Sequence, residues 1–440
     1  MLIRPAKRLR GRARVPGDKS VSHRAAILAA LARGRTRVMN FSSSADCAST
    51  LACLAALGVP VEREPGAVLI DGAGRAPGAW SFAEPAGPLD CGNSGTTMRL
   101  MAGVLAAQPF AATLAGDDSL SRRPMRRVVE PLELMGARVS TREGRAPLRV
   151  EGRRPLKAVE YAAPVASAQV KSCLLLAGLG AAGRTVVREP EPTRDHTERM
   201  LGWLGAGVGG EAADGGGRVV SVEGPALFEA RDIEVPGDLS SAAFLLAAAA
   251  LLPGSELSVE GVGLNPTRTE ILDTLRALGA DVRVEPEGGR SNEPAGRVVV
   301  RGGEGLRPRP GASVVGGRAV ARLIDELPVL AVVGAHAEGG LEIRDAAELR
   351  VKESDRISAV VSNLRAMGAR VEELEDGLRV EGGRRLSGAR LDSFGDHRVA
   401  MAFAVAALAA RGESFIEGAE ACVGVSFPEF FPLLESVAER

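Results

Sequence analysis

The tetrapeptide VPGD at residues 15–18 recurs at residues 235–238, and a run of small apolar residues follows both copies. The copies lie 220 residues apart, which is half the length of the 440-residue chain. A tetrapeptide repeated at this separation indicates an internal duplication.

Six segments along the chain share one form, a polar or charged start followed by a helix-length run of Ala, Leu, Val and Met. They begin near Lys19, Asn93, Ser167, Ser240, Asp325 and Asp396, at intervals of 71 to 85 residues. Because these segments are apolar nearly all round, we expect six buried helices that pack closely through small side chains. The longest interval contains a Gly/Pro/Arg-rich stretch from Glu285 to Gly317, which we interpret as an insertion.

A second pattern lies between these helices, an amphipathic helix that ends in a Leu-Gly or Met-Gly step. It occurs around Gly58, Gly136, Gly205, Gly279 and Gly368. Glycine at this point suits a helix C-cap with positive φ. Alternating residues follow, as at 148–152 and 378–382, and predict short strands. Each repeat is therefore expected to be mixed α/β.

Three repeats before and three after the second VPGD predict two similar domains. No strand set follows the sixth helix, since residues 427–439 have the pattern of a closing helix, so the N-terminal strand of about residues 9–15 is expected to complete that repeat. The chain would then start in one domain, build the other and return. We predict a discontinuous domain of residues 1–16 plus 235–440 and an inserted domain of residues 17–234, with the active site in the cleft between them.

Composition narrows the class of protein. The longest apolar run, residues 242–252, is too short to span a bilayer, and no apolar segment follows the charged N-terminus, which favours a cytoplasmic protein. The five cysteines show no metal-ligand spacing, so we expect reduced thiols, no metal and no cofactor. With 55 basic and 55 acidic residues, the chain has no excess charge for nucleic acid. Lysine occurs at only five positions, so each is a candidate for a specific role.

The polar starts of the six helices are the candidate binding groups. A helix N-terminus offers unpaired N–H groups and partial positive charge, which favours phosphate or carboxylate. The first helix opens with GDKSVSHR (17–24), which lacks the earlier glycine of an ATPase P-loop. The second follows GNSGTTMR (92–99), with RRPM (122–125) further on. The third opens with SAQVK (167–171), where a Lys opposes the helix dipole and so suggests a ligand.

The later repeats add acidic groups. Asp325 and Glu326 stand at a helix start, where simple capping is the alternative explanation. The densely charged VKESDR (351–356) and the GDHR (395–398) of the sixth repeat follow. Three of the four histidines (His23, His196 and His397) and three of the five lysines fall in these motifs or in the segment RDHTE (194–198). Together they indicate a reaction between two multiply anionic molecules, with Lys and carboxylates available for proton transfer.

The motifs GDKS, GNSGTTMR, RRPM, SAQVK, VKESDR and GDHR, in this order and spacing, resemble the 5-enolpyruvylshikimate-3-phosphate synthase family over about residues 9–428. The resemblance implies transfer of the enolpyruvyl group of phosphoenolpyruvate to the 5-hydroxyl of shikimate 3-phosphate, with release of phosphate, toward chorismate and the aromatic amino acids. It also implies two domains, each of three βαβαββ-type repeats, in an inverse α/β barrel, and a protein that acts as a monomer.

The resemblance also assigns site residues. For shikimate 3-phosphate it implies Lys19, Ser20, Arg24, Ser167, Gln169, Asp325 and Lys352. For phosphoenolpyruvate it implies Lys19, Gly95, Arg123, Gln169, Arg356 and Arg398. Asp325 is the candidate base at the hydroxyl, and Glu353 with Lys19 are candidates for the other proton transfers. Which group acts in which step stays open.

One position departs from the family pattern. Some members carry a Lys immediately before the C-terminal Thr/Ser-Phe-Pro, whereas Val425 stands there in this chain, so a phosphate contact from that position is absent. RDHTE (194–198) and NPTR (265–268), with GDKS and SAQVK, resemble the class II branch, in which reduced glyphosate sensitivity is common. Gly95 leaves room for that inhibitor, and an inhibition curve against phosphoenolpyruvate would settle sensitivity.

Two alternatives remain. The sister enzyme that transfers enolpyruvyl to UDP-N-acetylglucosamine typically has Lys-Asn at the first helix and a loop Cys, whereas this chain has Lys19-Ser20 and no Cys between Cys91 and Cys173. A non-enzymatic clamp built from similar repeats would need a diffuse basic lining and stacking aromatics, but aromatics total only 3%. We therefore expect small-molecule substrates, no nucleic acid and no membrane.

Overall fold

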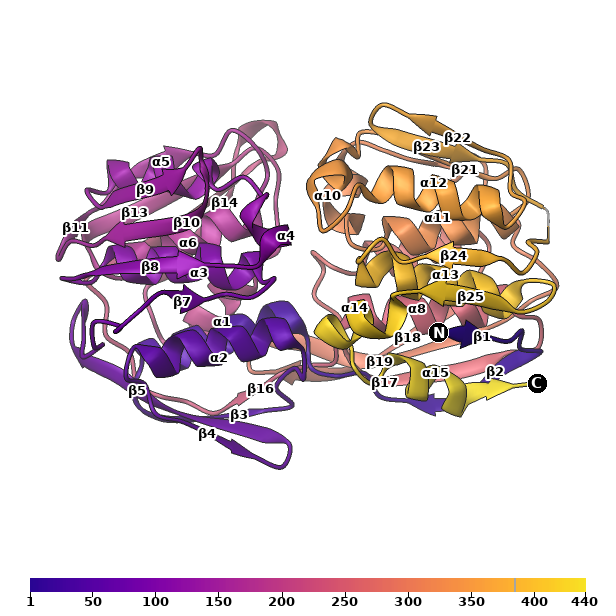
Figure 1. The fold of residues 1–440 in the computed structure, drawn as a ribbon. Helices are drawn as coiled ribbons and strands as arrows, with labels where there is room; N and C mark the ends of the chain where they lie inside the picture. Colours follow the sequence, from indigo (N-terminus) through magenta and orange to yellow (C-terminus); the bar gives the residue numbers. More distant parts are fainter. Residues whose placement is uncertain (384) are drawn as a thin grey trace. The chain divides into compact units, whose positions relative to one another are not determined.

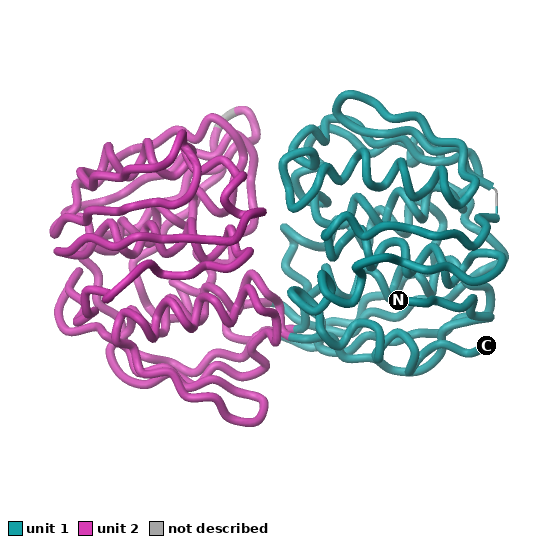
Figure 2. Tube along the Cα trace, in the orientation of Figure 1, with its two compact units in different colours: residues 1–16, 237–288, 294–440 teal, residues 17–236, 289–293 magenta. Residues whose placement is uncertain are grey.

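The computed structural model describes residues 1–383 and 385–440, apart from the side chain of Asp214. These residues form two compact units, coloured separately in Figure 2. Unit 1 comprises Met1–Pro16, Gly237–Gly288 and Pro294–Arg440. Unit 2 comprises Gly17–Pro236 and Gly289–Glu293. Each unit has its own hydrophobic core of Ala, Leu, Val and Ile side chains.

Six apolar helices form these cores, and each begins within two residues of its predicted start. In unit 2 they are α1 (Lys19–Leu31), α3 (Gly95–Ala106) and α6 (Ala168–Gly178). In unit 1 they are α8 (Leu239–Leu251), α11 (Leu327–His336) and α13 (His397–Ala409). Their small side chains let α1, α3 and α6 pack on one another, and likewise α8, α11 and α13. The prediction of six buried helices is confirmed.

Each repeat has a second helix, and most of these helices pack against the apolar core helices (Figure 1). These helices are α2 (Ala45–Ala56), α5 (Arg126–Leu134), α7 (His196–Trp203), α9 (Glu270–Ala277), α12 (Arg356–Ala366) and α14 (Ala419–Ser426). For example, α2 packs against α1, and α12 packs against α11. All five glycines predicted as C-caps have positive φ, from 77° to 101°. Shorter helices are α4 (Asp118–Ser121) and α10 (Arg318–Leu323), and α15 (Phe430–Val437) is the closing helix.

The strands of unit 2 form three sheets among its described residues. The first has the order β16-β3-β5-β4, with β6 beside β5, and consists of β16 (Ile233–Glu234), β3 (Arg33–Met39), β5 (Ala67–Ala76), β4 (Val61–Glu64) and β6 (Ala79–Trp80). The second consists of β7 (Leu89–Asp90), β8 (Ala111–Ala115), β10 (Arg145–Glu151) and β9 (Arg138–Arg142). The third consists of β11 (Leu156–Lys157), β13 (Ala181–Glu189), β15 (Arg218–Gly224) and β14 (Val208–Ala212), with β12 (Glu160–Ala162) beside β13.

Unit 1 also has three sheets in the part that the structure describes. The first consists of β18 (Asp281–Arg290), β19 (Glu293–Arg301), β17 (Glu256–Gly263), β2 (Arg8–Ala13) and β26 (Ala438–Glu439). The second consists of β20 (Val314–Val315), β21 (Leu341–Ile343), β23 (Gly377–Val380) and β22 (Val371–Leu374). The third consists of β1 (Leu2–Ile3), β25 (Ser414–Glu417) and β24 (Arg390–Asp392).

Each unit contains the strand that precedes the first helix of the other. Strand β2 precedes α1 of unit 2 but pairs in parallel with β17 of unit 1. Strand β16 precedes α8 of unit 1 but pairs in parallel with β3 of unit 2. Backbone hydrogen bonds at the two helix starts are exchanged in the same way. The N–H of Asp18, just before α1, donates to the carbonyl of Pro236 at 2.8 Å, and the N–H of Asp238, just before α8, donates to the carbonyl of Pro16 at 2.9 Å.

Two expectations about unit 1 were wrong. The strand near residues 9–15 does not complete the sixth repeat, because β2 lies between β17 and β26, and β1 at the very N-terminus joins β25 instead. The stretch 285–317 is not wholly an insertion. Its first half forms most of the β18–β19 hairpin of the fourth repeat, and the tip of this hairpin, Gly289–Glu293, belongs to unit 2.

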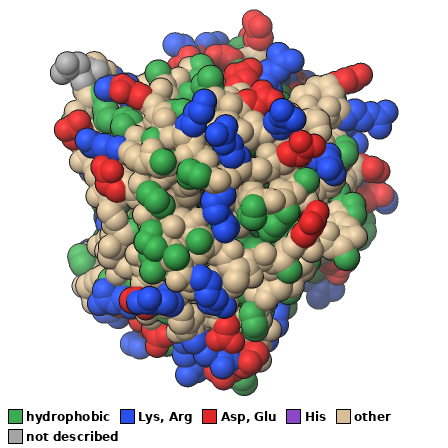
Figure 3. Space-filling model, turned by 90° about the vertical axis from the view of Figure 1, so that its left-hand side faces the viewer, with side chains coloured by type: hydrophobic (Ala, Val, Ile, Leu, Met, Phe, Trp, Pro, Cys, Tyr) green, Lys and Arg blue, Asp and Glu red, His purple; other side chains and the backbone are tan. Residues whose placement is uncertain are grey.

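The surface carries interspersed charges. On the face of unit 2 seen in Figure 3, basic and acidic side chains alternate over short distances. Ion pairs also link neighbouring strands of this unit, for example Arg37 with Glu64 at 3.4 Å and Arg35 with Asp71 at 3.5 Å. No described helix is both long and apolar enough to cross a membrane.

Candidate active site

The start of α1 places Lys19 beside a carboxylate. Asp18 caps the helix by accepting from the backbone N–H of Val21 at 2.9 Å. Lys19 Nζ lies 2.8 Å from Asp46 Oδ2, on α2. The ammonium is therefore held at a fixed point at the positive end of the helix, where an anion is favoured.

Arg24 follows Lys19 by five residues on α1, and its side chain is almost completely buried. Its Nε donates to Thr197 Oγ1 at 2.7 Å, and its Nη2 donates to Ser172 Oγ at 2.8 Å. Its Nη1 donates to the carbonyl of Ser20 at 2.9 Å. Burial lowers the pKa of Arg24 to about 10, so it stays charged at neutral pH. The guanidinium is therefore rigidly oriented and keeps donors for an incoming ligand.

Gly95 opens α3 against two guanidinium groups. A Cβ at this position would lie 2.8 Å from Arg99 Nη1 and 3.5 Å from Arg123 Nη1. Arg123 donates through Nη2 to Asn93 Oδ1 at 2.8 Å. The bare backbone of Gly95 thus lets both guanidinium groups approach the N-terminus of α3, a combination that favours an anion.

Gln169 joins α6 to this group. Its Oε1 accepts from Arg99 Nη1 at 2.6 Å, and its Nε2 donates to Thr96 Oγ1 at 2.9 Å. Ser167 caps α6 through the N–H of Val170 at 3.4 Å. The structure therefore brings Gly95, Arg123 and Gln169 together through Arg99, which was not among the predicted site residues although it ends the GNSGTTMR motif. Its place in that motif was the signal.

Lys171 does not have the suggested role of a ligand-facing residue. Its side chain is 1% exposed, and its Nζ lies 2.9 Å from Glu189 Oε2 and 2.8 Å from Glu198 Oε1. The unfavourable position of a Lys near a helix N-terminus is offset by these two carboxylates from β13 and α7 rather than by a substrate.

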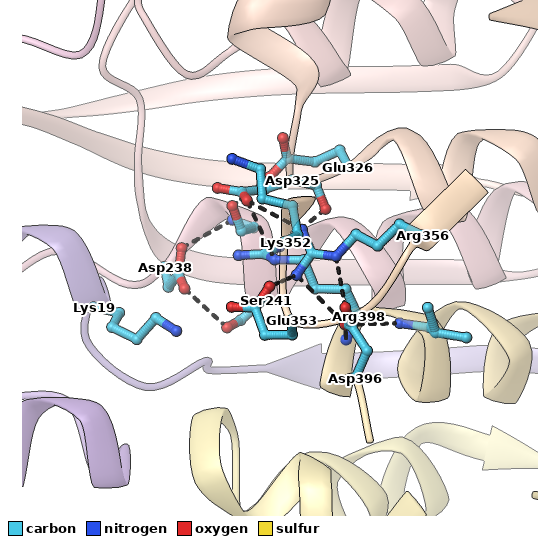
Figure 4. A network of polar contacts seen from close by, with 12 residues as sticks. Lys19, Asp238, Ser241, Asp325, Glu326, Lys352, Glu353, Arg356, Asp396 and Arg398 are labelled. Atoms are coloured by element: carbon cyan, nitrogen blue, oxygen red, sulfur yellow. Dashed lines mark hydrogen bonds and ion pairs between the residues drawn. The ribbon is translucent and has the colours of Figure 1, made fainter. Parts of the chain in front are cut away.

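In unit 1, Asp325 lies between two arginines (Figure 4). Its Oδ1 is 3.5 Å from Arg398 Nε and 3.8 Å from Arg356 Nη1. Arg398 Nη1 also donates to the Asp325 carbonyl at 3.1 Å. Glu326 rather than Asp325 occupies the N-cap of α11, without a side-chain capping bond, so simple capping does not explain this acidic pair.

Arg356 is almost completely buried within this group. Its Nε donates to Asp396 Oδ2 at 2.8 Å and its Nη2 to Glu353 Oε2 at 2.6 Å. Burial opposes its charge, but Asp396, Glu353 and Asp325 outweigh burial and raise the pKa of Arg356 above its usual value. Its Nη1 makes no hydrogen bond to any residue that the structure describes. A buried charged donor with free capacity is suited to an incoming anion.

Lys352 completes this cluster. Its Nζ donates to Glu348 Oε1 at 3.4 Å, one turn earlier. Burial lowers the pKa of Lys352 from its ordinary value, against the opposing effect of Glu348 and Asp325. Unit 1 thus brings together Asp325, Lys352, Glu353, Arg356 and Arg398 of the predicted set, and adds Asp396, which the GDHR motif contained but which was not selected.

Between residues 1–383 and 385–440, no group of three or more His, Cys, Asp or Glu side chains has the arrangement of a metal site. All five cysteines are free. The clusters described above consist of cationic, amide and hydroxyl side chains, with carboxylates among them.

Comparison with known proteins decides the family. The family model described as EPSP synthase (3-phosphoshikimate 1-carboxyvinyltransferase) matches residues 3–434. The chain belongs to this family. The 3-phosphoshikimate 1-carboxyvinyltransferase of Koribacter versatilis is 51% identical over 100% of this chain and 99% of its own, and that of Salinibacter ruber is 51% identical over 99% of each.

Solved structures agree with this membership. EPSP synthase from Acinetobacter baumannii matches with a TM-score of 0.86 at 41% identity, over 99% of this chain and 98% of that chain. The enolpyruvyl transferase NikO from Streptomyces tendae matches with a TM-score of 0.76 over 99% and 96%. At 21% identity, the likeness to NikO concerns the fold alone. The predicted α/β fold of repeated units is confirmed.

Proposed function

We propose that this chain carries out the reaction of the EPSP synthase family on the side chains described above. It transfers the enolpyruvyl group of phosphoenolpyruvate to the 5-hydroxyl of shikimate 3-phosphate and releases phosphate. The observation that carries the assignment is the placement of Asp325 between Arg356 and Arg398, with Lys352 and Glu353 beside them. This arrangement offers two carboxylates for acid–base chemistry, Asp325 and Glu353, among fixed cations.

Shikimate 3-phosphate is assigned to the hydroxyl and cation set of both units. The contributing residues are Lys19, Ser20, Arg24, Ser167, Gln169, Asp325 and Lys352. The supporting contacts are the bonds that orient Arg24 and Gln169, since a preoriented donor loses little freedom when a ligand binds. Arg24 and Lys19 supply charge for the phosphate, and Asp325 is the group for the hydroxyl.

Phosphoenolpyruvate is assigned to the arginine set. The contributing residues are Lys19, Gly95, Arg123, Gln169, Arg356 and Arg398. Guanidinium groups suit a carboxylate or a phosphate because they bind it in two-pronged fashion and do not titrate. The close approach of the Arg99 and Arg123 guanidinium groups to the bare backbone of Gly95 supports this assignment, as does Arg356 Nη1, which makes no hydrogen bond to a described residue.

The reaction proceeds by addition and then elimination. The hydroxyl oxygen bonds to C2 of phosphoenolpyruvate as Asp325 takes the hydroxyl proton, and the methylene carbon gains a proton to become a methyl group. The resulting tetrahedral intermediate then loses a methyl proton as the bond from C2 to the phosphate oxygen breaks. Glu353 and Lys19 are the groups proposed for the carbon proton and for the leaving phosphate.

Residues of both units must act on the same two substrates in this proposal. We accordingly propose that the units are two functional domains and that substrates engage both at once. One chain supplies the whole set of proposed residues, so a monomer is sufficient for the reaction. We expect light scattering to give the molecular mass of one chain.

We also propose that the protein is cytoplasmic, because free cysteines suit a reducing compartment.

Replacing Lys19 by Met tests the assignment. Because the ammonium is a fixed anion-binding charge, we expect kcat/KM to fall by about two orders of magnitude with unchanged thermal unfolding. Phosphate release with both substrates is the measurement, and Lys157→Met, at an exposed site, is the control. Retained activity in Lys19→Met would overturn the assignment, and turnover with UDP-N-acetylglucosamine would favour the sister activity.

The pH dependence of substrate binding provides a second test. Burial lowers the pKa of Lys352, so its positive charge is lost as the pH rises through a value below that of an ordinary Lys. We expect kcat/KM for shikimate 3-phosphate to fall at alkaline pH, and Lys352→Arg to move that alkaline limb to higher pH because guanidinium stays charged. An unmoved limb, or an equal movement in Lys157→Arg, would contradict this role.

A further inference from the structure

A chain of buried hydrogen bonds runs beneath the starts of α1 and α3. His23 Nδ1 lies 2.7 Å from Thr50 Oγ1 on α2, and Thr50 Oγ1 lies 2.7 Å from Thr97 Oγ1 on α3. Thr97 Oγ1 lies 2.8 Å from Oγ of Ser94, the N-cap of α3. Each of these side chains is at most 2% exposed. We call these four residues the α1–α3 hydrogen-bond chain.

The number of protons on each group fixes which side chain donates and which accepts along the α1–α3 hydrogen-bond chain. Thr97 has a single hydroxyl proton, which it donates either to Ser94 Oγ or to the carbonyl of Asp46, and in both cases it must accept from Thr50. Thr50 has then used its own proton and must accept from His23, which places the proton of a neutral imidazole on Nδ1. His23 Nε2 makes no hydrogen bond among the described residues, and in this tautomer it carries no N–H that needs an acceptor.

The imidazole is uncharged at physiological pH. Burial is the main cause that lowers the pKa of His23 to about 3, and Lys19 and Arg24 add to the effect while Asp46 and Asp18 oppose it. The α1–α3 hydrogen-bond chain is therefore a fixed, uncharged link between these helices. Such a link is costly to break inside an apolar core, because each freed donor or acceptor stays buried without a partner.

The two ends of the chain adjoin proposed substrate groups. His23 lies one turn after Lys19 on α1, and Ser94 immediately precedes Gly95. Thr97 Oγ1 also lies 3.3 Å from the carbonyl of Asp46, the residue that pairs with the Lys19 ammonium. One buried link thus ties α1, α2 and the N-terminus of α3 together beneath these groups.

We propose that the α1–α3 hydrogen-bond chain sets the position of Gly95 relative to Lys19 and so preorganises the phosphoenolpyruvate subsite. Thr50 and Thr97 are positioning residues, since they act through their neighbours and touch no substrate. This inference rests on the proposed function for the roles of Lys19 and Gly95. Most of the side chains assigned to shikimate 3-phosphate are others than Lys19 and Gly95. The binding of shikimate 3-phosphate should therefore depend much less on the α1–α3 hydrogen-bond chain.

Thr50→Val removes the central hydroxyl and keeps the shape of the side chain. We expect KM for phosphoenolpyruvate to rise about tenfold, because His23 and Thr97 lose their bridge, with KM for shikimate 3-phosphate within about twofold of the parent. Thr50→Ser restores the hydroxyl and should return KM for phosphoenolpyruvate to near the parent value. Steady-state kinetics with each substrate varied in turn provides the comparison.

Thr185→Val is the matched control, because Thr185 is equally buried in unit 2 but its Oγ1 makes no hydrogen bond to a described residue. It should leave both KM values unchanged. Equal rises in both KM values for Thr50→Val, or no rescue by Thr50→Ser, would overturn the inference. If Thr50→Val does not fold, Thr50→Cys, which keeps the size and weakens the bond, is judged by the same split between the two KM values.

The outcomes separate this inference from the function on which it rests. A large loss in Lys19→Met with no change of KM in Thr50→Val defeats the positioning role alone. Normal activity in Lys19→Met defeats the site assignment itself.

Discussion

Replacing Asp325 by Asn is expected to lower kcat by about two to four orders of magnitude, the range for loss of a general base. The amide keeps the size and one acceptor oxygen of the carboxylate, so contacts to Arg398 and Arg356 are weakened but not abolished. An amide cannot take the proton of the substrate hydroxyl at neutral pH. Binding of shikimate 3-phosphate should therefore change much less than kcat.

Isothermal titration with shikimate 3-phosphate and phosphate-release kinetics measure these two quantities separately. Asp273→Asn is the control, because this carboxylate of α9 is exposed and lies outside the cluster. If Asp325→Asn turns over at a rate near that of the control, Asp325 is not the base, and Glu353→Gln becomes the variant that should lose kcat.

Replacing Lys171 by Met is expected to destabilise the protein by about 3–5 kcal/mol, the cost of removing one partner from a buried ion pair. Met fills nearly the same volume, so packing is preserved. Glu189 and Glu198, whose side chains are 1% and 8% exposed, would be left as buried carboxylates without their cation. Urea unfolding gives the free energy of unfolding directly.

The matched control is Lys157→Met, an exposed position where the free energy of unfolding should change by less than about 0.5 kcal/mol. The combination of Lys171→Met with Glu189→Gln and Glu198→Gln should recover part of the loss, because amides are cheaper to bury than unpaired carboxylates. A single Lys171→Met variant as stable as the control would show that the three charges do not depend on one another.

Local sequence was sufficient to predict the helices. The start of α1 or α13 follows from an Asp cap before a run of small apolar residues, and the end of α9 follows from Gly279, so both signals lie within a few residues of the feature. Strand pairing has no such local signal. Strand β2 was assigned to the wrong repeat because its partner β17 lies far along the chain, and alternation shows that a strand exists without showing its neighbour.

The motifs likewise identified candidate site residues, but they did not show how these residues are arranged in space. Arg356 and Arg398 were selected by motif. Of the carboxylates around Arg356, Glu353 lies three residues before it, but Asp325 and Asp396 come from distant positions, and their contacts with Arg356 could be seen only in the fold. Lys171 shows the opposite case. Its helix position suggested a ligand, whereas its partners on β13 and α7, 18 and 27 residues later, neutralise it inside the core.

The exchange of β2 and β16 has a consequence for how the protein is made. Residues 17–236 of unit 2 leave the ribosome as one uninterrupted piece, whereas β2 is synthesised first and finds its place beside β17 only after Ser255, 246 residues beyond Leu9, has emerged. Loop closure over such a distance is slow. Unit 2 can therefore complete its sheets during translation, while β2 of unit 1 stays unpaired until β17 has been synthesised.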